Sequence, residues 1–117
     1  MNHLTPLVLI MAGSTLALTL CYDFSALAAD ASATLYSERC APCHGDTGRG
    51  DGPAGKYLQP PPAAIANAIK GRTDDWIAKV IKGGGGAVGE SPTMPASPDL
   101  SDDQVKGLID YLRHLGS

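Results

Sequence analysis

The stretch Cys40-Ala41-Pro42-Cys43-His44 decides how the rest of this chain is interpreted. Two cysteines stand three positions apart, and a histidine directly follows the second one. At the end of a helix, this spacing directs two thiols and one imidazole to the same side. It suits thioether bonds from both cysteines to the vinyl groups of one haem, with the histidine as a ligand of the iron.

Three other interpretations of Cys40 and Cys43 stay open. The pair resembles a thioredoxin-type dithiol, although that fold needs βαβ units and no stretch convincingly alternates apolar and polar residues. A structural zinc site needs four ligands, and the third cysteine, Cys21, belongs to a segment that we expect to be removed. A plain disulfide leaves a loop-rich interior unfilled. The spacing favours one covalently bound haem c, attached to Cys40 and Cys43, with His44 as an axial ligand.

The sixth position of such an iron has few candidate ligands. Met94 lies between prolines in Ser91-Pro92-Thr93-Met94-Pro95, outside any expected helix. A thioether is a soft donor that favours ferrous iron and raises the reduction potential. The alternatives are a Met94 that fills the core, a ligand role for His114 in the last turn of a helix, and an open sixth position. We expect His44 and Met94 as the two axial ligands.

Residues 1–28 have the pattern of a secretory signal peptide. An uncharged and mostly apolar run covers residues 7–20, which is short for a membrane-spanning helix of about 20 residues. Ala26 and Ala28 provide the small residues of an A-x-A cleavage site, although residues 1–6 contain no Lys or Arg. An uncleaved anchor is the alternative. We expect cleavage after Ala28, no membrane anchor in the mature chain, and a location in the periplasm or an equivalent exported compartment.

The composition excludes two classes of protein. With 117 residues the chain holds one domain, which is too little for a large catalytic domain. Nine basic and twelve acidic residues give a formal net charge of −3, which argues against nucleic-acid binding. Fourteen glycines and nine prolines indicate many turns. Large apolar side chains are few after residue 28, so we expect a bulky cofactor to complete the core.

Helical periodicity indicates an all-α chain with long loops and no strands. The expected helices cover residues 31–41, 62–70, 73–83 and 101–116. Thr73 and Ser101 are expected N-caps, because acidic residues follow each of them in the first turn. Glycine- and proline-rich intervals at 45–61 and 83–100 are expected to be loops.

Together these elements resemble the small soluble mono-haem c-type cytochromes with His/Met ligation. The resemblance covers nearly all of residues 29–117 and includes Gly-Asp-Gly-Pro-Ala-Gly at 50–55, Met94-Pro95, and the final-helix sequence Leu-Ile-Asp-Tyr-Leu at 108–112. It implies a small cytochrome c-like helical domain over 29–117, with long loops wrapped around one haem. It also implies that Tyr36 packs against Leu108 and Tyr111 where the first and last helices cross.

The resemblance implies an electron carrier that is not an enzyme and that meets redox partner proteins through small, weak interfaces. A haem peroxidase or small-molecule sensor with an open sixth site is one alternative. A haem subunit of a larger dehydrogenase or oxidase complex is another.

The resemblance implies one further contact of the histidine, and the chain also departs from the family pattern in places. The carbonyl of Pro53 is expected to hold the His44 ring. Ser32 replaces a glycine that the family often has eight positions before the first cysteine. The four glycines at 83–86 are expected to make the loop around Met94 mobile. The candidate partners for the haem propionates are Tyr57, Arg72 and Trp76, of which Trp76 also suits the core.

Overall fold

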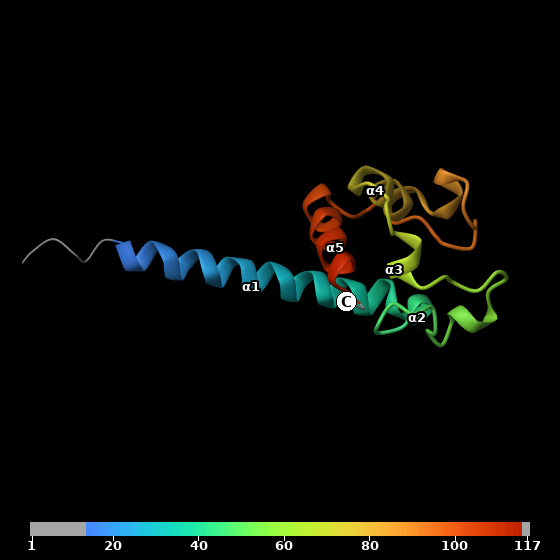
Figure 1. Ribbon diagram of the computed structural model, residues 1–117, viewed down its shortest axis with the longest axis horizontal. Helices are drawn as coiled ribbons and strands as arrows, with labels where there is room; N and C mark the ends of the chain where they lie inside the picture. Colours follow the sequence, from blue (N-terminus) through green and yellow to red (C-terminus); the bar gives the residue numbers. More distant parts are fainter. Residues whose placement is uncertain (1–13, 116–117) are drawn as a thin grey trace, which may run out of the picture.

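The computed structural model describes residues 14–115, and within them every regular element is helical. The expectation of an all-α fold is confirmed. Figure 1 shows α1 reaching out from the body of the molecule, with α5 crossing the end of α1 that precedes α2. The elements in chain order are α1 (Ser14–Arg39), α2 (Ala41–His44), η1 (Gly55–Tyr57), α3 (Ile65–Ala68), α4 (Asp74–Gly83), η2 (Gly85–Val88) and α5 (Asp102–His114).

The crossing of α1 and α5 forms the centre of the core. Tyr36 and Leu108 are each only 1% exposed, and the rings of Tyr36 and Tyr111 are 5.2 Å apart between centroids. Burial of a side chain such as Leu108 contributes about 1.5–3 kcal/mol. The expected contact of Tyr36 with the final helix is therefore confirmed.

Two small residues allow α1 and α5 to approach closely. Ser32 is buried on α1, and its hydroxyl donates a hydrogen bond to the carbonyl of Ala28 at 3.1 Å. A Cβ added to Gly107 on α5 would lie 2.5 Å from the Ser32 Oγ. The absence of a side chain at Gly107 therefore leaves the space that the Ser32 hydroxyl occupies between the two helices.

The starts of α4 and α5 are set by side-chain caps, as the sequence predicts. The Thr73 hydroxyl accepts the Trp76 N–H at 3.2 Å, and α4 follows directly. Ser101 and Gln104 form a reciprocal capping box at the start of α5, with distances of 3.2 and 2.9 Å. Each cap satisfies backbone N–H groups that a helix start otherwise leaves unpaired.

The first and second predicted helices differ from the structure. The segment predicted at 31–41 is the end of a helix that already begins at Ser14, and regular α1 stops at Arg39. Pro42 lacks the N–H that would continue the α1 ladder, which explains the break. The segment predicted at 62–70 shortens to α3, because Ala64 is extended and the Ile65 N–H donates to the Gly48 carbonyl at 2.7 Å instead of to its own segment.

The signal-peptide prediction concerns residues that the structure describes only in part. Residues 1–13 lie outside the described residues, and Ala28 lies within α1. Cleavage after Ala28 therefore stays a prediction. Among the described helices, none has both the length and the apolar character needed to cross a membrane.

Candidate haem-binding site

The two cysteines and the histidine of the motif lie on one helical turn, which we call the cysteine turn (residues 40–44). The N–H of Cys40 still donates to the Tyr36 carbonyl of α1 at 2.8 Å, and the Cys40 carbonyl accepts the His44 N–H at 2.8 Å. Cys40, Cys43 and His44 are all half-buried. The end of α1 and the short α2 thus bring two sulfurs and one imidazole together within five residues.

Both thiols of the cysteine turn are free. Cys40 and Cys43 form no disulfide in the structure. Burial raises the pKa of the Cys40 thiol, and the neighbouring Arg39 partly opposes this effect. The described residues contain no strand for a thioredoxin-type sheet and no group of three metal-binding side chains of the His, Cys, Asp or Glu type. The cysteine pair is therefore available for covalent attachment.

Burial of the His44 imidazole favours the neutral form that a metal ligand requires. Burial lowers the pKa of His44, so the neutral ring is favoured at neutral pH. Its Nδ1 is buried and has no hydrogen-bond partner. Such an unpaired buried group costs about 1–3 kcal/mol. A neutral imidazole beside two free thiols is the donor set that covalent haem attachment uses, so these residues fit that group.

The expected hydrogen bond from the His44 ring to the Pro53 carbonyl is absent, because the His44 Nδ1 has no partner. The loop that carries Pro53 nevertheless packs on the cysteine turn through its backbone. The Gly52 N–H donates to the Cys43 carbonyl at 3.2 Å, and the Ala54 N–H donates to the Pro42 carbonyl at 2.8 Å. Those two bonds set the position of the loop, and the prediction about Pro53 is wrong in this structure.

Glycines and a buried tyrosine support the cysteine turn. A Cβ on Gly52 would lie 2.5 Å from the carbonyl oxygens of both Ala41 and Pro42, and a Cβ on Gly55 would lie 2.3 Å from that of Cys43. The hydroxyl of Tyr36 donates to the Gly45 carbonyl at 2.6 Å. The glycine-rich stretch at 50–55 thus allows a backbone contact that side chains would prevent.

Met94 lies in an irregular segment between η2 and α5, which we call the methionine loop (residues 90–96). The Met94 side chain is half-buried, its N–H donates to the Ser91 carbonyl at 3.3 Å, and its carbonyl accepts the Gly85 N–H at 3.1 Å. In Figure 1 the methionine loop, drawn orange, and α2 lie on opposite sides of α3. Met94 is thus outside the helices, as the sequence predicts, and its role as a ligand stays a prediction.

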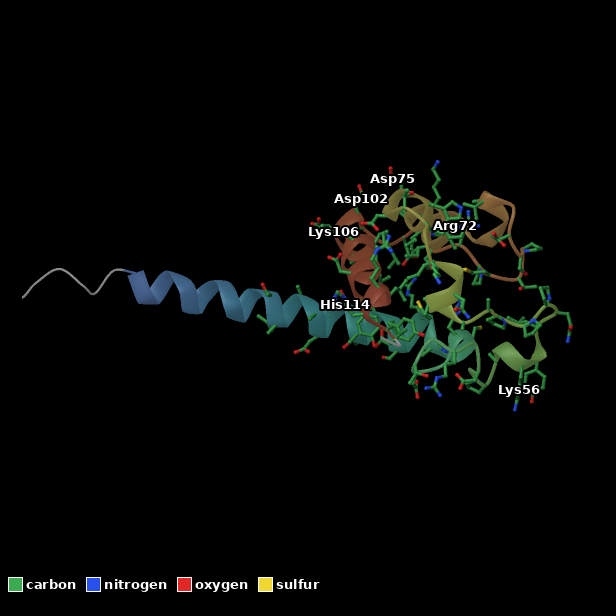
Figure 2. The ribbon with its side chains drawn as sticks, in the orientation of Figure 1. Lys56, Arg72, Asp75, Asp102, Lys106 and His114 are labelled. Atoms are coloured by element: carbon green, nitrogen blue, oxygen red, sulfur yellow. The ribbon has the colours of Figure 1, made fainter. Side chains whose placement is uncertain are left out.

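His114, the other candidate ligand, interacts with its own helix. Its Nδ1 lies 2.7 Å from the Asp110 carbonyl, one turn earlier on α5, and its side chain is exposed. Figure 2 shows His114 where α5 comes close to α1.

The three candidate propionate partners do not gather in one place. The Arg72 guanidinium lies 4.4 Å from the ring centroid of Trp76, and Trp76 packs against the core. Tyr57 is 78% exposed and stacks with its neighbour Lys56 at 5.1 Å. Figure 2 shows Lys56 and Arg72 in separate parts of the body. Arg72 and Trp76 are brought together, and Tyr57 is not.

The fold and the donor set are those of a haem protein, and comparison with known proteins identifies the family. The family model described as Cytochrome c matches residues 29–116, and the chain belongs to this family. Membership implies that the chain binds haem c.

Two curated relatives are subunits of oxidases. The chain is 34% identical over 92 residues to the Cbb3-type cytochrome c oxidase subunit CcoP of Azospirillum brasilense, which covers 78% of this chain and 30% of the relative. It is 36% identical over 85 residues to the subunit of the same name from Azospirillum sp. (strain B510), which covers 71% of this chain and 27% of the relative. The chain therefore spans less than a third of each relative. No solved structure matches it.

Proposed function

We propose that the chain is a one-electron carrier with a single haem c, attached through Cys40 and Cys43 and ligated axially by His44 and Met94. The observation that carries the proposal is the cysteine turn. Two free thiols and a half-buried imidazole share one helical turn in a member of the cytochrome c family. Bound haem supplies reversible exchange between ferric and ferrous iron.

The protein residues hold this site in one geometry. The Cys40 N–H donates to the Tyr36 carbonyl and the His44 N–H donates to the Cys40 carbonyl, and these bonds tie the donor atoms to the end of α1, whose core contacts are buried. A site that does not rearrange between oxidation states loses little energy to reorganisation. With two protein ligands the iron has no open position for a substrate, so we propose that the chain is not an enzyme.

The proposal includes redox partner proteins and an exported location. Carriers of this kind meet donors and acceptors through small, transient interfaces, so that each encounter is short. The predicted signal peptide at 1–28 supports a periplasmic location.

The names of the relatives favour a second candidate, a haem subunit of a larger oxidase. Both relatives are oxidase subunits, and this chain matches less than a third of each. A free carrier purifies alone as a monomer, whereas a subunit copurifies with a defined complex after mild detergent extraction. Size-exclusion chromatography of the haem-stained protein from its native source separates the two candidates.

The test of the haem proposal is the absorption spectrum of the exported protein. We expect a c-type spectrum after reduction, covalently bound haem on a denaturing gel, and the far-red methionine–iron band after oxidation. Met94→Ala should abolish the far-red band, and His114→Ala, the matched control, should retain it. A high-spin spectrum without the band in the unaltered protein would favour a peroxidase or sensor. Absence of covalent haem would contradict both functions.

A further inference from the structure

The run of four glycines at 83–86 contacts the methionine loop through two of its members. Gly84 has φ +78° and ψ 172°, a backbone conformation that is essentially restricted to glycine. Its N–H donates to the Val80 carbonyl at 2.8 Å and ends α4. A Cβ added to Gly84 would lie 2.8 Å from the carbonyl oxygen of Met94 and 3.1 Å from the amide nitrogen of Ala96.

Gly85 joins both ends of the methionine loop by hydrogen bonds. Its N–H donates to the Met94 carbonyl at 3.1 Å, and its carbonyl accepts the Glu90 N–H at 2.9 Å. A Cβ on Gly85 would lie 2.1 Å from the carbonyl oxygen of Ser91, a distance that requires the backbone of the loop to move. The backbone around Met94 is therefore seated directly on Gly85.

The other two glycines of the run have different surroundings. A Cβ on Gly86 would meet nothing within 4 Å, and one on Gly83 would approach only the Cβ of Ala87, at 2.7 Å. Only Gly84 and Gly85 contact the methionine loop in this way. This packing opposes the expectation that the glycine run makes the loop mobile, because the absent side chains allow close contact.

We propose that Gly84 and Gly85 are positioning residues that hold Met94 in place as the sixth ligand of the iron. The inference rests on the proposed ligand role of Met94. A thioether on a flexible side chain stays bound only while the backbone at residue 94 is held, since external ligands compete for the same position. Gly85 supplies this restraint through its main-chain contacts with the methionine loop. A side chain at position 85 would displace these contacts.

The test compares Gly85→Ala with Gly86→Ala in the haem-loaded protein. Both variants add one methyl group to adjacent glycines, but only the group at 85 meets the methionine loop. We expect Gly85→Ala to lose most of the far-red band, to lower the reduction potential and to bind cyanide more tightly. The change in cyanide affinity should be about tenfold, because backbone strain of the usual size shifts a two-state equilibrium by about that factor. Gly86→Ala should match the unaltered protein in all three measurements.

A role limited to folding would lower the melting temperature of Gly85→Ala without changing the band, the potential or the cyanide affinity. That result would overturn the inference while leaving the ligand role of Met94 intact. Absence of the far-red band in the unaltered protein would overturn the ligand role itself and the inference with it.

A second measurement applies if Gly85→Ala yields no folded protein. In the unaltered protein, cyanide displaces the methionine, and amide hydrogen exchange is then measured with and without cyanide. We expect faster exchange at the Gly85 N–H, which donates to Met94, and no change at the Gly48 N–H, which donates to Gly45 at 3.1 Å beside the cysteine turn. Unchanged exchange at Gly85 would overturn the inference.

Discussion

The cysteine turn and the methionine loop both position candidate donor side chains, but they do so in different ways. In the cysteine turn, three donor side chains lie within five consecutive residues, and helical hydrogen bonds between neighbours set their geometry. In the methionine loop a single donor side chain lies on irregular backbone. Residues 81–85 hold this backbone through the hydrogen bond from the Gly85 N–H to the Met94 carbonyl and, just after the loop, the bond from the Ser97 N–H to the Ile81 carbonyl. Local spacing therefore brings the donors of the cysteine turn together, and contacts with Gly52 and Gly55 support them, whereas the methionine loop depends on tertiary contacts throughout.

In both regions, nevertheless, other backbone packs closely against a glycine that has no side chain to prevent the contact. At the cysteine turn the glycine is Gly52, whose added Cβ would collide with two carbonyl oxygens and with the Cys43 carbonyl carbon at 2.5–2.6 Å. At the methionine loop it is Gly85, whose closest collision is with the single carbonyl oxygen of Ser91, at 2.1 Å. The contact at Gly52 involves more of the neighbouring backbone, so we expect its disruption to be the more damaging.

The largest effect is expected from Gly52→Ala. All three atoms that the new methyl group meets are backbone atoms of the helical turn, which cannot rotate away. We expect a loss of about 3 kcal/mol in the free energy of unfolding, at the upper end of the usual cost of overpacking, measured by urea denaturation of the haem-loaded protein. Gly86→Ala is the control, because its methyl group has open space. Equal stability of the two variants would show that the cysteine turn does not need this close contact.

A smaller effect is expected from Tyr36→Phe, which removes the link between α1 and the end of the cysteine turn. The lost hydroxyl leaves the Gly45 carbonyl with the Gly48 N–H as its remaining partner, at a cost of about 0.5–1.5 kcal/mol. Tyr57→Phe, at a side chain that is 78% exposed, should change the stability little. Urea denaturation measures both variants, and a similar loss in both would contradict the assigned role of the Tyr36 hydroxyl.

The same hydroxyl gives this prediction a pH dependence. Burial is the main cause that raises the pKa of Tyr36 from 10.0 to about 12. Because the folded state holds the proton more tightly, the contribution of this group to stability is complete below pH 10 and is lost as the pH rises toward 12. The stability advantage of the unaltered protein over Tyr36→Phe should shrink over that interval.

The smallest effect is expected from Asp99→Asn, which breaks an ion pair between residues that flank the two regions. Arg39, next to Cys40, donates to both carboxylate oxygens of Asp99, beyond the methionine loop, at 3.0 and 2.7 Å. Both side chains are exposed, so solvent and salt weaken the pair. We expect a slightly lower melting temperature at low salt and no difference from the unaltered protein at high salt.

Acid should remove the contribution of this ion pair. The hydrogen bond from Arg39 holds the pKa of Asp99 below its ordinary value of 3.8. The contribution is therefore present above about pH 4 and is lost as the pH falls through the lowered pKa. Asp110→Asn, which breaks the exposed pair with Lys106 inside α5, is the matched control. An Asp99→Asn variant that keeps its full deficit at high salt would contradict the electrostatic origin.

The parts of the fold that sequence predicts well depend on neighbouring residues. Thr73 and Ser101 act as N-caps within three residues of their partners, so both helix starts are correct. The cysteine turn is equally local. The crossing of Tyr36 and Tyr111 was predictable through the family resemblance, although the residues are far apart in the chain.

The parts that sequence does not predict depend on what lies opposite in space. In the sequence, a run of glycines indicates only conformational freedom, so we expected the methionine loop to be mobile. In the structure, the absence of side chains at Gly84 and Gly85 allows them to contact the backbone of that loop. The role of Gly107 likewise becomes visible only when it faces Ser32. The expected bond of Pro53 failed for a related reason, since the direction of one carbonyl depends on the whole loop.

The pairing of α1 with α5 also has a consequence for the order of events during synthesis. Tyr36 is made early and Tyr111 late, so the core around Tyr36 stays incomplete until nearly all of the described chain exists. Until α5 docks, the thiols of Cys40 and Cys43, directly after α1, therefore belong to a chain whose core is incomplete.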